Sequence, residues 1–353
     1  MKTDKIPIAS LTPEELTEAL KLAPSFRGKQ IFRWLWRGVL DFEKMTNLPL
    51  TEREELAGKA GLTTLITETH IDEDSTVKLK IRLADGLFIE TVLLVDERGR
   101  KTACLSVQVG CGMRCAFCRT GLMGLKRNLK DYEIAEQLLH LLSLYGRIDN
   151  IVLMGMGEPL ENLDAVRGAV GIFHHPEGLG MSLRRITIST CGIVSGIEEL
   201  AGRGPHVRLA LSLVTADPSL REKLMPVTRQ NPLDRVKDAL ISYQRKTGRR
   251  ITLEIVLLAG VNDRPRDAEY LVSFARGLKV VVNLIPWNPA SDLDFSSPSG
   301  EEVARFKRML EEAGFNVTER YRRGRGINGA CGQLMVIQPD LRNLRLEARH
   351  ESF

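Results

Sequence analysis

The stretch "VGCGMRCAFCRTGLMG", residues 109–124, places three cysteines within eight positions, spaced C-x3-C-x2-C. Common zinc and iron–sulfur sites built from sulfur ligands use four thiolates, so Cys111, Cys115 and Cys118 leave one place to fill. A structural zinc site would need a second pair of ligands, and the sequence has neither another C-x2-C pair nor a histidine near the loop. A cubane cluster on three thiolates instead keeps one iron open for a small molecule that binds through an amine and a carboxylate.

The chain has 353 residues, enough for one large domain with an appendage or for two domains. No stretch approaches the roughly 18–20 uninterrupted apolar residues of a membrane span, and the first residues lack the apolar core of a signal peptide. We therefore expect a cytoplasmic protein that does not enter a membrane, whose six cysteines are free, catalytic or metal-bound rather than disulfide-bonded. The net charge of +5 permits a nucleic-acid partner without requiring one.

Residues 1–62 show helical periodicity and are expected to form an N-terminal helical domain. Thr12-Pro13-Glu14-Glu15 is a capping-box start with proline at the first helical position. A second helix is expected over residues 28–38, and cationic side chains lie around it. They are either the solvated face of a helix packed on the domain or part of an accessory nucleic-acid-binding element. These side chains are Arg27, Lys29, Arg33 and Arg37.

Residues 63–98 are expected to form a β-hairpin extension. The runs "TVKLKIRL" and "LFIETVLLV" flank Asp85-Gly86, a hairpin turn signal. Glu90 interrupts the second apolar run. Burial would raise its pKa toward the range that suits a general base near neutral pH. The alternative is an edge-strand glutamate that faces water.

From residue 99 to 340, short apolar runs alternate with longer helical patterns, and a tail of residues 341–353 follows. This alternation predicts a parallel sheet buried on both faces. Six such units are too few for a closed eight-fold barrel, so we expect an α/β fold with an open, partial barrel of six β/α units. The expected strands are 103–109, 150–154, 185–190, 207–213, 251–258 and 280–286. The expected helices are 131–145, 161–174, 194–202, 232–247, 267–278 and 300–313.

The motifs that carry chemistry follow the carboxyl ends of these strands, where parallel α/β folds place their active sites. Their coincidence at one edge is a stronger signal than any one of them alone. They are the cysteine loop, the glycine-rich turn 155–159, and the segments 189–192, 212–214 and 283–288.

The cysteine spacing, with Phe117 before the last cysteine, resembles the radical S-adenosylmethionine (SAM) superfamily. The resemblance implies a [4Fe-4S] cluster on Cys111, Cys115 and Cys118, with the methionine amino and carboxylate groups of SAM at the fourth position. Further segments are similar to the RlmN/Cfr family, over residues from about 24 to about 334. These segments are "SVQVGCGMRCAFCRTGLMGLKRNL", "VLMGMGEPLENLDAV", "RRITISTCGIV", "NLIPWNP" and "ACGQL".

The RlmN/Cfr resemblance implies methylation of an adenine in 23S ribosomal RNA, and "MGEPL" and "LIPWNP" look more like the carbon-2 branch than the carbon-8 branch. In that family one SAM methylates a protein cysteine, and a second supplies the radical that activates this methyl group. By resemblance, Cys331 carries the methyl group, Cys104 is the resolving cysteine that forms a transient disulfide with it, and Glu90 is the general base. Cys191 matches no role and is interpreted as a small buried residue.

The resemblance also implies a set of SAM contacts. The family usually reads Ser-Leu-His where this chain has valine third, and a valine side chain cannot form a hydrogen bond. Either that contact is made by the backbone, or this chain binds SAM somewhat differently. The implied contacts are Gly157, Glu158, Ser189, Ser212, Leu213, Val214 and Asn288.

The segment "RYRRGRG", residues 320–326, carries four arginines just before Cys331 and is interpreted as a phosphate clamp. The resemblance implies 23S ribosomal RNA as partner and makes residues 1–62 an RNA-binding accessory domain. It leaves transfer RNA open as a second substrate and calls for a low-potential electron donor such as flavodoxin or ferredoxin. We expect a monomer. Two alternatives remain: a radical SAM enzyme that acts on a protein or small molecule, and a non-catalytic iron–sulfur or zinc RNA-binding protein.

Overall fold

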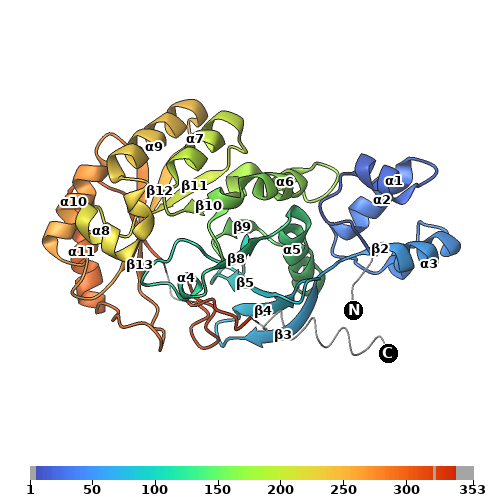
Figure 1. The fold of residues 1–353 in the computed structure, drawn as a ribbon, viewed down its shortest axis with the longest axis horizontal. Helices are drawn as coiled ribbons and strands as arrows, with labels where there is room; N and C mark the ends of the chain where they lie inside the picture. The colour runs from blue at the N-terminus through green and yellow to red at the C-terminus, as the bar shows by residue number, and fades with distance from the viewer. Residues whose placement is uncertain (1–4, 321–322, 339–353) are drawn as a thin grey trace.

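The computed structural model describes residues 5–320 and 323–338, so the expected tail, 341–353, lies outside the described residues. A helical N-terminal region lies beside a larger body in which helices surround a curved sheet (Figure 1). None of the described helices has the length and apolar character that crossing a membrane requires.

The N-terminal region contains α1 (Pro13–Leu20), α2 (Phe26–Leu35) and α3 (Leu50–Lys59), closed by the short parallel pair β1 (Ile6–Pro7) and β2 (Ala60–Gly61). The predicted capping box of α1 is confirmed. The Glu15 backbone N–H donates to Thr12 Oγ1 at 3.3 Å, and the Thr12 N–H donates to Glu15 Oε2 at 2.8 Å. Apolar faces of α1 and α2 are buried against each other, as the helical periodicity predicted.

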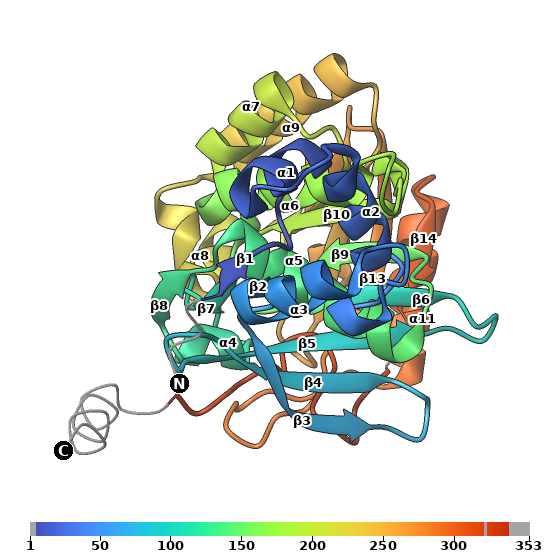
Figure 2. The ribbon, with the colours of Figure 1, turned by 90° about the vertical axis from the view of Figure 1, so that its right-hand side faces the viewer.

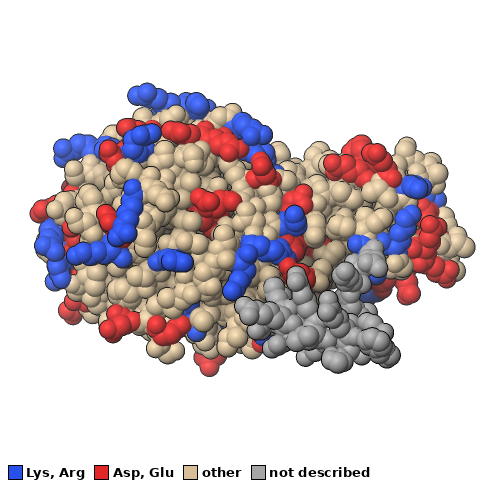
Figure 3. Space-filling model, viewed as in Figure 1, with Lys and Arg blue, Asp and Glu red and all other residues tan. Residues whose placement is uncertain are grey.

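The cationic side chains of α2 form ion pairs with carboxylates of the same chain. Arg27 pairs with Glu52 at 3.2 Å, and Arg33 pairs at 2.6 Å with Glu177, which also pairs with Lys29. Glu177 belongs to the main body, so its ion pairs with Lys29 and Arg33 join the N-terminal region to that body. Acidic side chains gather over the N-terminal helices on the face shown in Figure 3. This pairing favours the packed-helix interpretation over a nucleic-acid-binding face.

Ten strands form one open sheet, in the order β14-β13-β12-β11-β10-β9-β6-β5-β4-β3. From β6 to β14 the pairing is parallel, and from β3 to β6 it is antiparallel, so the expected hairpin extends the barrel sheet (Figure 2). The strands are β3 (Leu65–Ile71), β4 (Val77–Arg82), β5 (Phe88–Val95), β6 (Lys101–Cys104), β9 (Asn150–Leu153), β10 (Ile186–Thr190), β11 (Arg208–Ser212), β12 (Ile251–Leu257), β13 (Val280–Pro286) and β14 (Val317–Glu319).

Two strand predictions were incomplete. β14 was not predicted, and it adds a seventh parallel strand beside β13. The expected strand 103–109 is broken, because Ser106 leaves the sheet and is held by Gln137, which accepts from the Ser106 N–H at 2.8 Å and donates to its carbonyl at 2.9 Å. The chain then forms β7 (Gln108–Gly110), which pairs with β8 (Leu125–Asn128) in a separate sheet.

Helices cover the outer face of the parallel strands, as the α/β prediction requires. Helix α5 has the predicted bounds, whereas α4 and α8 were not predicted. The helices are α4 (Arg119–Leu122), α5 (Asp131–Tyr145), α6 (Leu163–His174), α7 (Val194–Arg203), α8 (Pro218–Leu224), α9 (Leu233–Thr247), α10 (Pro265–Ala275) and α11 (Gly300–Glu312).

The link between the N-terminal region and β3 is held by a buried carboxylate of α5. Glu136 accepts from the Thr63 N–H at 2.9 Å and from the Thr64 N–H at 2.8 Å. His140, one turn later, lies with Nε2 2.9 Å from Thr64 Oγ1. Burial raises the pKa of Glu136 to about 7 and lowers the pKa of His140 to about 4.

Candidate active site

A cavity of about 720 Å³ opens at the carboxyl ends of the parallel strands. The five predicted motif segments all contribute to its lining, so the expectation that they meet at one edge is confirmed. The segment 329–332 and strand β5 close its other side. Predicted residues in the lining are Cys104, Cys111, Cys115, Cys118, Gly157, Glu158, Ser189, Ser212, Asn288 and Cys331.

The backbone of the cysteine loop is hydrogen-bonded to three distant segments. The Ala116 N–H donates to the Leu224 carbonyl at 2.9 Å, and the Arg119 N–H donates to the Gly332 carbonyl at 2.9 Å. Trp287 donates through Nε1 to the Phe117 carbonyl at 3.0 Å. The loop is therefore fixed by α8, by the end of β13 and by the segment that carries Cys331.

The three thiols of the loop fit the ligands of a cluster. All are free and face the same cavity. Burial raises the pKa of Cys111 to about 12 and that of Cys115 well above its ordinary value, so thiolates here need a nearby cation, which iron would supply. Within the described residues, no three His, Cys, Asp or Glu side chains converge on a single metal ion. A cubane does not need such convergence, because each iron takes its own thiolate.

Glu158 is buried at the cavity wall in a fixed position. Its Oε1 accepts from the Leu160 N–H at 3.1 Å, its Oε2 from the Cys191 N–H at 2.8 Å, and its own N–H donates to Gln108 at 2.9 Å. Gly157 has φ +103°, and a Cβ there would lie 2.6 Å from the Cβ of Gln108, so only glycine fits. The glycine-rich turn is thus built by close packing against β7.

Asn288 presents an unused acceptor. Its Nδ2 donates to the Cys331 carbonyl at 3.2 Å, while its buried Oδ1 has no hydrogen-bond partner among the described residues. A buried orphan acceptor requires a donor, and the amino group of a bound amino-acid moiety is one. Together with Glu158, Ser189 and Ser212 in the same cavity, this atom fits SAM.

Two predicted SAM contacts are placed differently. Leu213 and Val214 are not among the described residues that line the cavity, and both side chains are buried. The Val214 N–H donates to the Glu254 carbonyl at 3.2 Å, and its carbonyl accepts from Asn262 at 2.9 Å. Val214 also has φ +62°, a conformation that a β-branched residue rarely adopts. The valine therefore shapes the turn after β11.

The relatives of this chain decide its family. Residues 105–271 match the radical SAM superfamily, and residues 10–62 match the ribosomal RNA large subunit methyltransferase N-terminal domain. The chain is 49% identical over 328 residues to a "Probable dual-specificity RNA methyltransferase RlmN" of Treponema pallidum (strain Nichols), covering 93% of this chain and 96% of the relative. It is 42% identical to the "Dual-specificity RNA methyltransferase RlmN" of Sorangium cellulosum (strain So ce56), covering 94% and 95%.

The chain belongs to the RlmN family of radical SAM methyltransferases. A crystal structure of a radical SAM methyltransferase from Sphaerobacter thermophilus has the same fold, with a TM-score of 0.88 at 42% identity, covering 93% of this chain and 98% of that one. The predicted family and the α/β radical SAM fold are confirmed, and the protein is a methyltransferase. The individual site residues stay predictions.

In this RlmN-family fold the two cysteines predicted to act on substrate share the cavity. Cys104 ends β6 and is buried, whereas Cys331 projects into the open cavity and is exposed. Gly332 has φ +82° and turns the chain back toward the cysteine loop. Thr120 Oγ1 donates to the Leu334 carbonyl at 2.7 Å, which fixes the segment after Cys331.

Glu90 lies outside the cavity lining within the described part of this RlmN-family chain. Its carboxylate pairs with Lys78 at 3.0 Å and accepts from the Met335 N–H at 3.0 Å. Burial raises its pKa, and Lys78 opposes that shift. The edge-strand alternative is wrong, because Glu90 is 4% exposed. The segment after Cys331 covers the proposed base.

Two charged residues of the RlmN-family site, Arg221 and Glu254, were not predicted, and Arg320 was predicted only as part of the phosphate clamp. Arg221 is fully buried and donates to the carbonyls of Leu213 at 3.1 Å and Cys191 at 2.6 Å. Arg320 and Glu254 line the cavity. Glu254 interrupts the apolar run of β12, the same signal that singled out Glu90. No local pattern indicates Arg221, which lies in the short helix α8, whereas Arg320 begins the basic run 320–326.

Proposed function

We propose that the protein methylates carbon 2 of the adenine of the peptidyl transferase region in 23S ribosomal RNA (adenine 2503 type), and the adenine beside the anticodon of some transfer RNAs. The observation that carries the proposal is the meeting of two free thiols, Cys104 and Cys331, with the cysteine loop in one cavity. The names of the relatives, dual-specificity RNA methyltransferases, support two classes of RNA substrate.

Carbon 2 of adenine lies between two ring nitrogens and is electron-poor, so it does not attack the methyl group of SAM as an amine would. When bound, the cluster on Cys111, Cys115 and Cys118 would supply the electron that turns SAM into a radical source. We propose that two SAM molecules are used per turnover, because one must methylate Cys331 and another must activate that methyl group.

Three residues of the chain would then carry separate steps of the reaction. Cys331 is exposed in the cavity and held by Asn288, so its methylated sulfur can present a carbon to the base. We assign the removal of the ring proton to Glu90, whose raised pKa suits a base near neutral pH. For that step the Met335 N–H must leave the Glu90 carboxylate, so the Cys331 segment has to move when RNA binds. Cys104 then displaces the product by forming a disulfide with Cys331.

The RNA must deliver an unstacked base, because the cavity is enclosed by protein on the cluster side. Single-stranded loops offer such bases most readily. Arg323 lines the cavity and fits the proposed phosphate clamp, whereas Tyr321 and Arg322 lie outside the described residues. We further propose a cytoplasmic monomer that takes electrons from a flavodoxin or a ferredoxin.

Mass spectrometry of RNA treated with the anaerobically reconstituted enzyme tests the proposal. Transcripts of 23S ribosomal RNA and transfer RNA are incubated in parallel with isotopically labelled SAM, and the position of the added methyl group is read from nuclease fragments. We expect 2-methyladenosine in both. A methyl group at carbon 8 would assign the chain to the alternative, Cfr-like activity, and unmodified RNA would overturn the proposal.

A further inference from the structure

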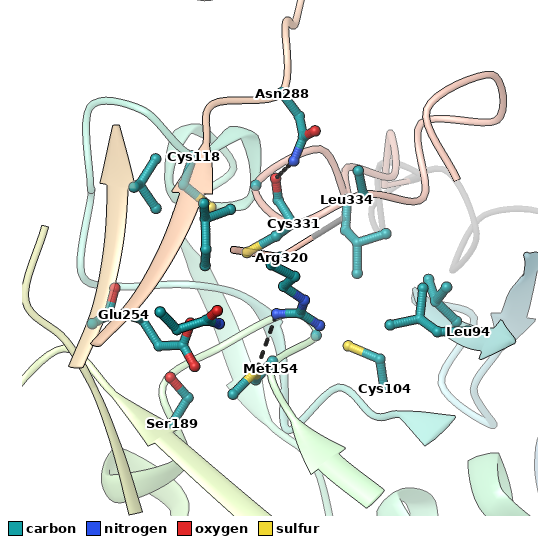
Figure 4. A pocket seen from close by; sticks show the side chains of 18 of the residues that line it. Leu94, Cys104, Cys118, Met154, Ser189, Glu254, Asn288, Arg320, Cys331 and Leu334 are labelled. Carbon is teal, nitrogen blue, oxygen red and sulfur yellow. Dashed lines mark hydrogen bonds between the residues drawn. The ribbon is translucent and has the colours of Figure 1, made fainter. Parts of the chain in front are cut away.

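Arg320 occupies the space between the two cysteines assigned to the substrate. It follows β14 directly, and its N–H donates to the Leu284 carbonyl at 2.9 Å, which anchors its backbone to β13. Figure 4 shows its guanidinium group lying between the sulfur atoms of Cys331 and Cys104. An arginine at the substrate-facing centre of a cavity is not needed to build the sheet.

The Arg320 guanidinium group has more N–H donors than the acceptors found for it among the described residues. Among the described residues, its hydrogen-bond acceptor is the sulfur of Met154, 3.7 Å from Nη1 (Figure 4). A thioether is a weak acceptor, and a guanidinium carries five N–H donors. Within the described residues the guanidinium group thus has only a weak acceptor where two thiols face it, and a thiolate is an acceptor that would complete its hydrogen bonding.

The surrounding charges hold Arg320 in its cationic form and set its effect on Cys104. Glu254 of β12, which accepts from Asn283 at 2.6 Å, raises the pKa of Arg320. Burial, with a smaller contribution from Cys331, raises the pKa of the Cys104 thiol to about 12. Among the described residues, the Arg320 side chain and a backbone hydrogen bond from Met154 act in the opposite direction and lower the pKa of Cys104, Arg320 more strongly.

We propose that Arg320 is a positioning residue that stabilises the thiolate of Cys104 for its attack on Cys331. The inference rests on the proposed function and adds a residue to its last step. Cys104 loses its proton, and its electron pair forms the S–S bond with Cys331. The bond between Cys331 Sγ and the methylene carbon breaks. Its electron pair passes to that carbon, which takes up a proton and leaves as the methyl group of the base.

The step balances without an outside oxidant, because the two sulfurs are oxidised as the carbon is reduced. Without Arg320, less Cys104 thiolate forms at a given pH, so release of the RNA slows while formation of the adduct continues. The distinguishing phenotype is an accumulating protein–RNA adduct in a protein that keeps both cysteines.

The test measures Cys104 directly in the cluster-loaded protein. Arg320→Gln, Arg320→Lys and the wild type are alkylated with iodoacetamide across a pH series, and the peptide containing Cys104 is quantified by mass spectrometry. The matched control is Arg100→Gln, which removes another cation of the cavity lining that pairs with Asp96 at 2.6 Å. RNA adducts are followed on denaturing gels in the same preparations.

We expect Arg320→Gln to move the alkylation profile of Cys104 upward by about one pH unit and to slow RNA release about tenfold. Arg320→Lys should restore most of both, and Arg100→Gln should leave the profile unchanged. An unshifted profile in Arg320→Gln, or a profile that lysine does not restore, overturns the inference. Wild-type enzyme that leaves RNA unmethylated overturns the proposed function instead, whatever the alkylation profile.

Discussion

The carboxylate of Glu158 accepts a hydrogen bond from the backbone N–H of Cys191 at 2.8 Å, across 33 positions of sequence. The carbonyl of Cys191 in turn accepts from Arg221 at 2.6 Å. The peptide groups at the end of β10 are therefore held from both sides by buried charged side chains. Cys191 matches no catalytic role, and its contribution comes from its backbone.

Replacing Glu158 with glutamine should destabilise the protein and weaken SAM binding. An amide has one acceptor oxygen, so one of the N–H groups of Leu160 and Cys191 would face an NH2 group, at a cost of about 1–3 kcal/mol. Urea denaturation and calorimetric titration with SAM measure the two effects. The exposed Glu161→Gln is the control, and equal stability of the two variants would contradict the role of Glu158.

Arg221→Met should lower the free energy of unfolding by about 3 kcal/mol or more, because it leaves the buried carbonyls of Leu213 and Cys191 without their donor. Arg229, paired with Glu222 on the surface at 2.7 Å, is the comparison. Its replacement by methionine should change stability by less than about 0.5 kcal/mol. Chemical denaturation of both variants decides the matter.

Cys331→Ala should abolish RNA methylation while leaving the cluster and the cleavage of SAM intact. Cys331 is exposed in the cavity. Its backbone carbonyl accepts from Asn288, and the neighbouring Gly332 carbonyl accepts from the Arg119 N–H of the cysteine loop, so alanine at position 331 preserves both hydrogen bonds. Iron and sulfide content, deoxyadenosine formation and methyl transfer to RNA are measured side by side. Methylated RNA from this variant would refute the role of Cys331.

Cys104→Ala should trap RNA in a covalent complex, because the thioether to Cys331 then has no thiol to displace it. The adduct is detected as a slow band on a denaturing gel that protease treatment removes. Cys191→Ala, a second buried cysteine of the same lining, should release its RNA. Only free RNA after turnover of Cys104→Ala would count against the resolving role.

The buried pair Glu136 and His140 predicts compensating effects of pH on stability. Burial raises the pKa of Glu136 from 4.5 to about 7, so the folded state holds the extra proton and this contribution to stability falls as pH rises through that range. Burial lowers the pKa of His140 from 6.5 to about 4, so the unfolded state holds the extra proton and its contribution rises with pH.

The two slopes oppose each other between pH 4.5 and 6.5. Glu136→Gln should therefore make the free energy of unfolding rise more steeply with pH in this range than in the wild type. His140→Gln should make it fall. Urea denaturation at half-unit pH steps measures the slopes. If the free energy of unfolding of both variants depended on pH as it does in the wild type, these groups would not titrate as described.

Local pattern was enough for much of the fold. Helix α5 has the predicted bounds, and the six predicted parallel strands are present, five of them within two residues of their predicted ends. Apolar periodicity reports which face of an element is buried, and that information lies within each segment. The position of the cavity could also be predicted from the sequence, because the carboxyl ends of parallel strands share one edge wherever the intervening chain runs.

The sequence by itself thus determined the family, the strand-and-helix alternation and the edge that carries the cysteines. Only the tertiary structure decided that Ser106 breaks the first strand, that Met335 covers Glu90, and that Arg320 lies between Cys104 and Cys331. Each of these depends on contacts between residues far apart in the chain. Such contacts are set by how the elements pack, and no periodicity or spacing within a segment records them.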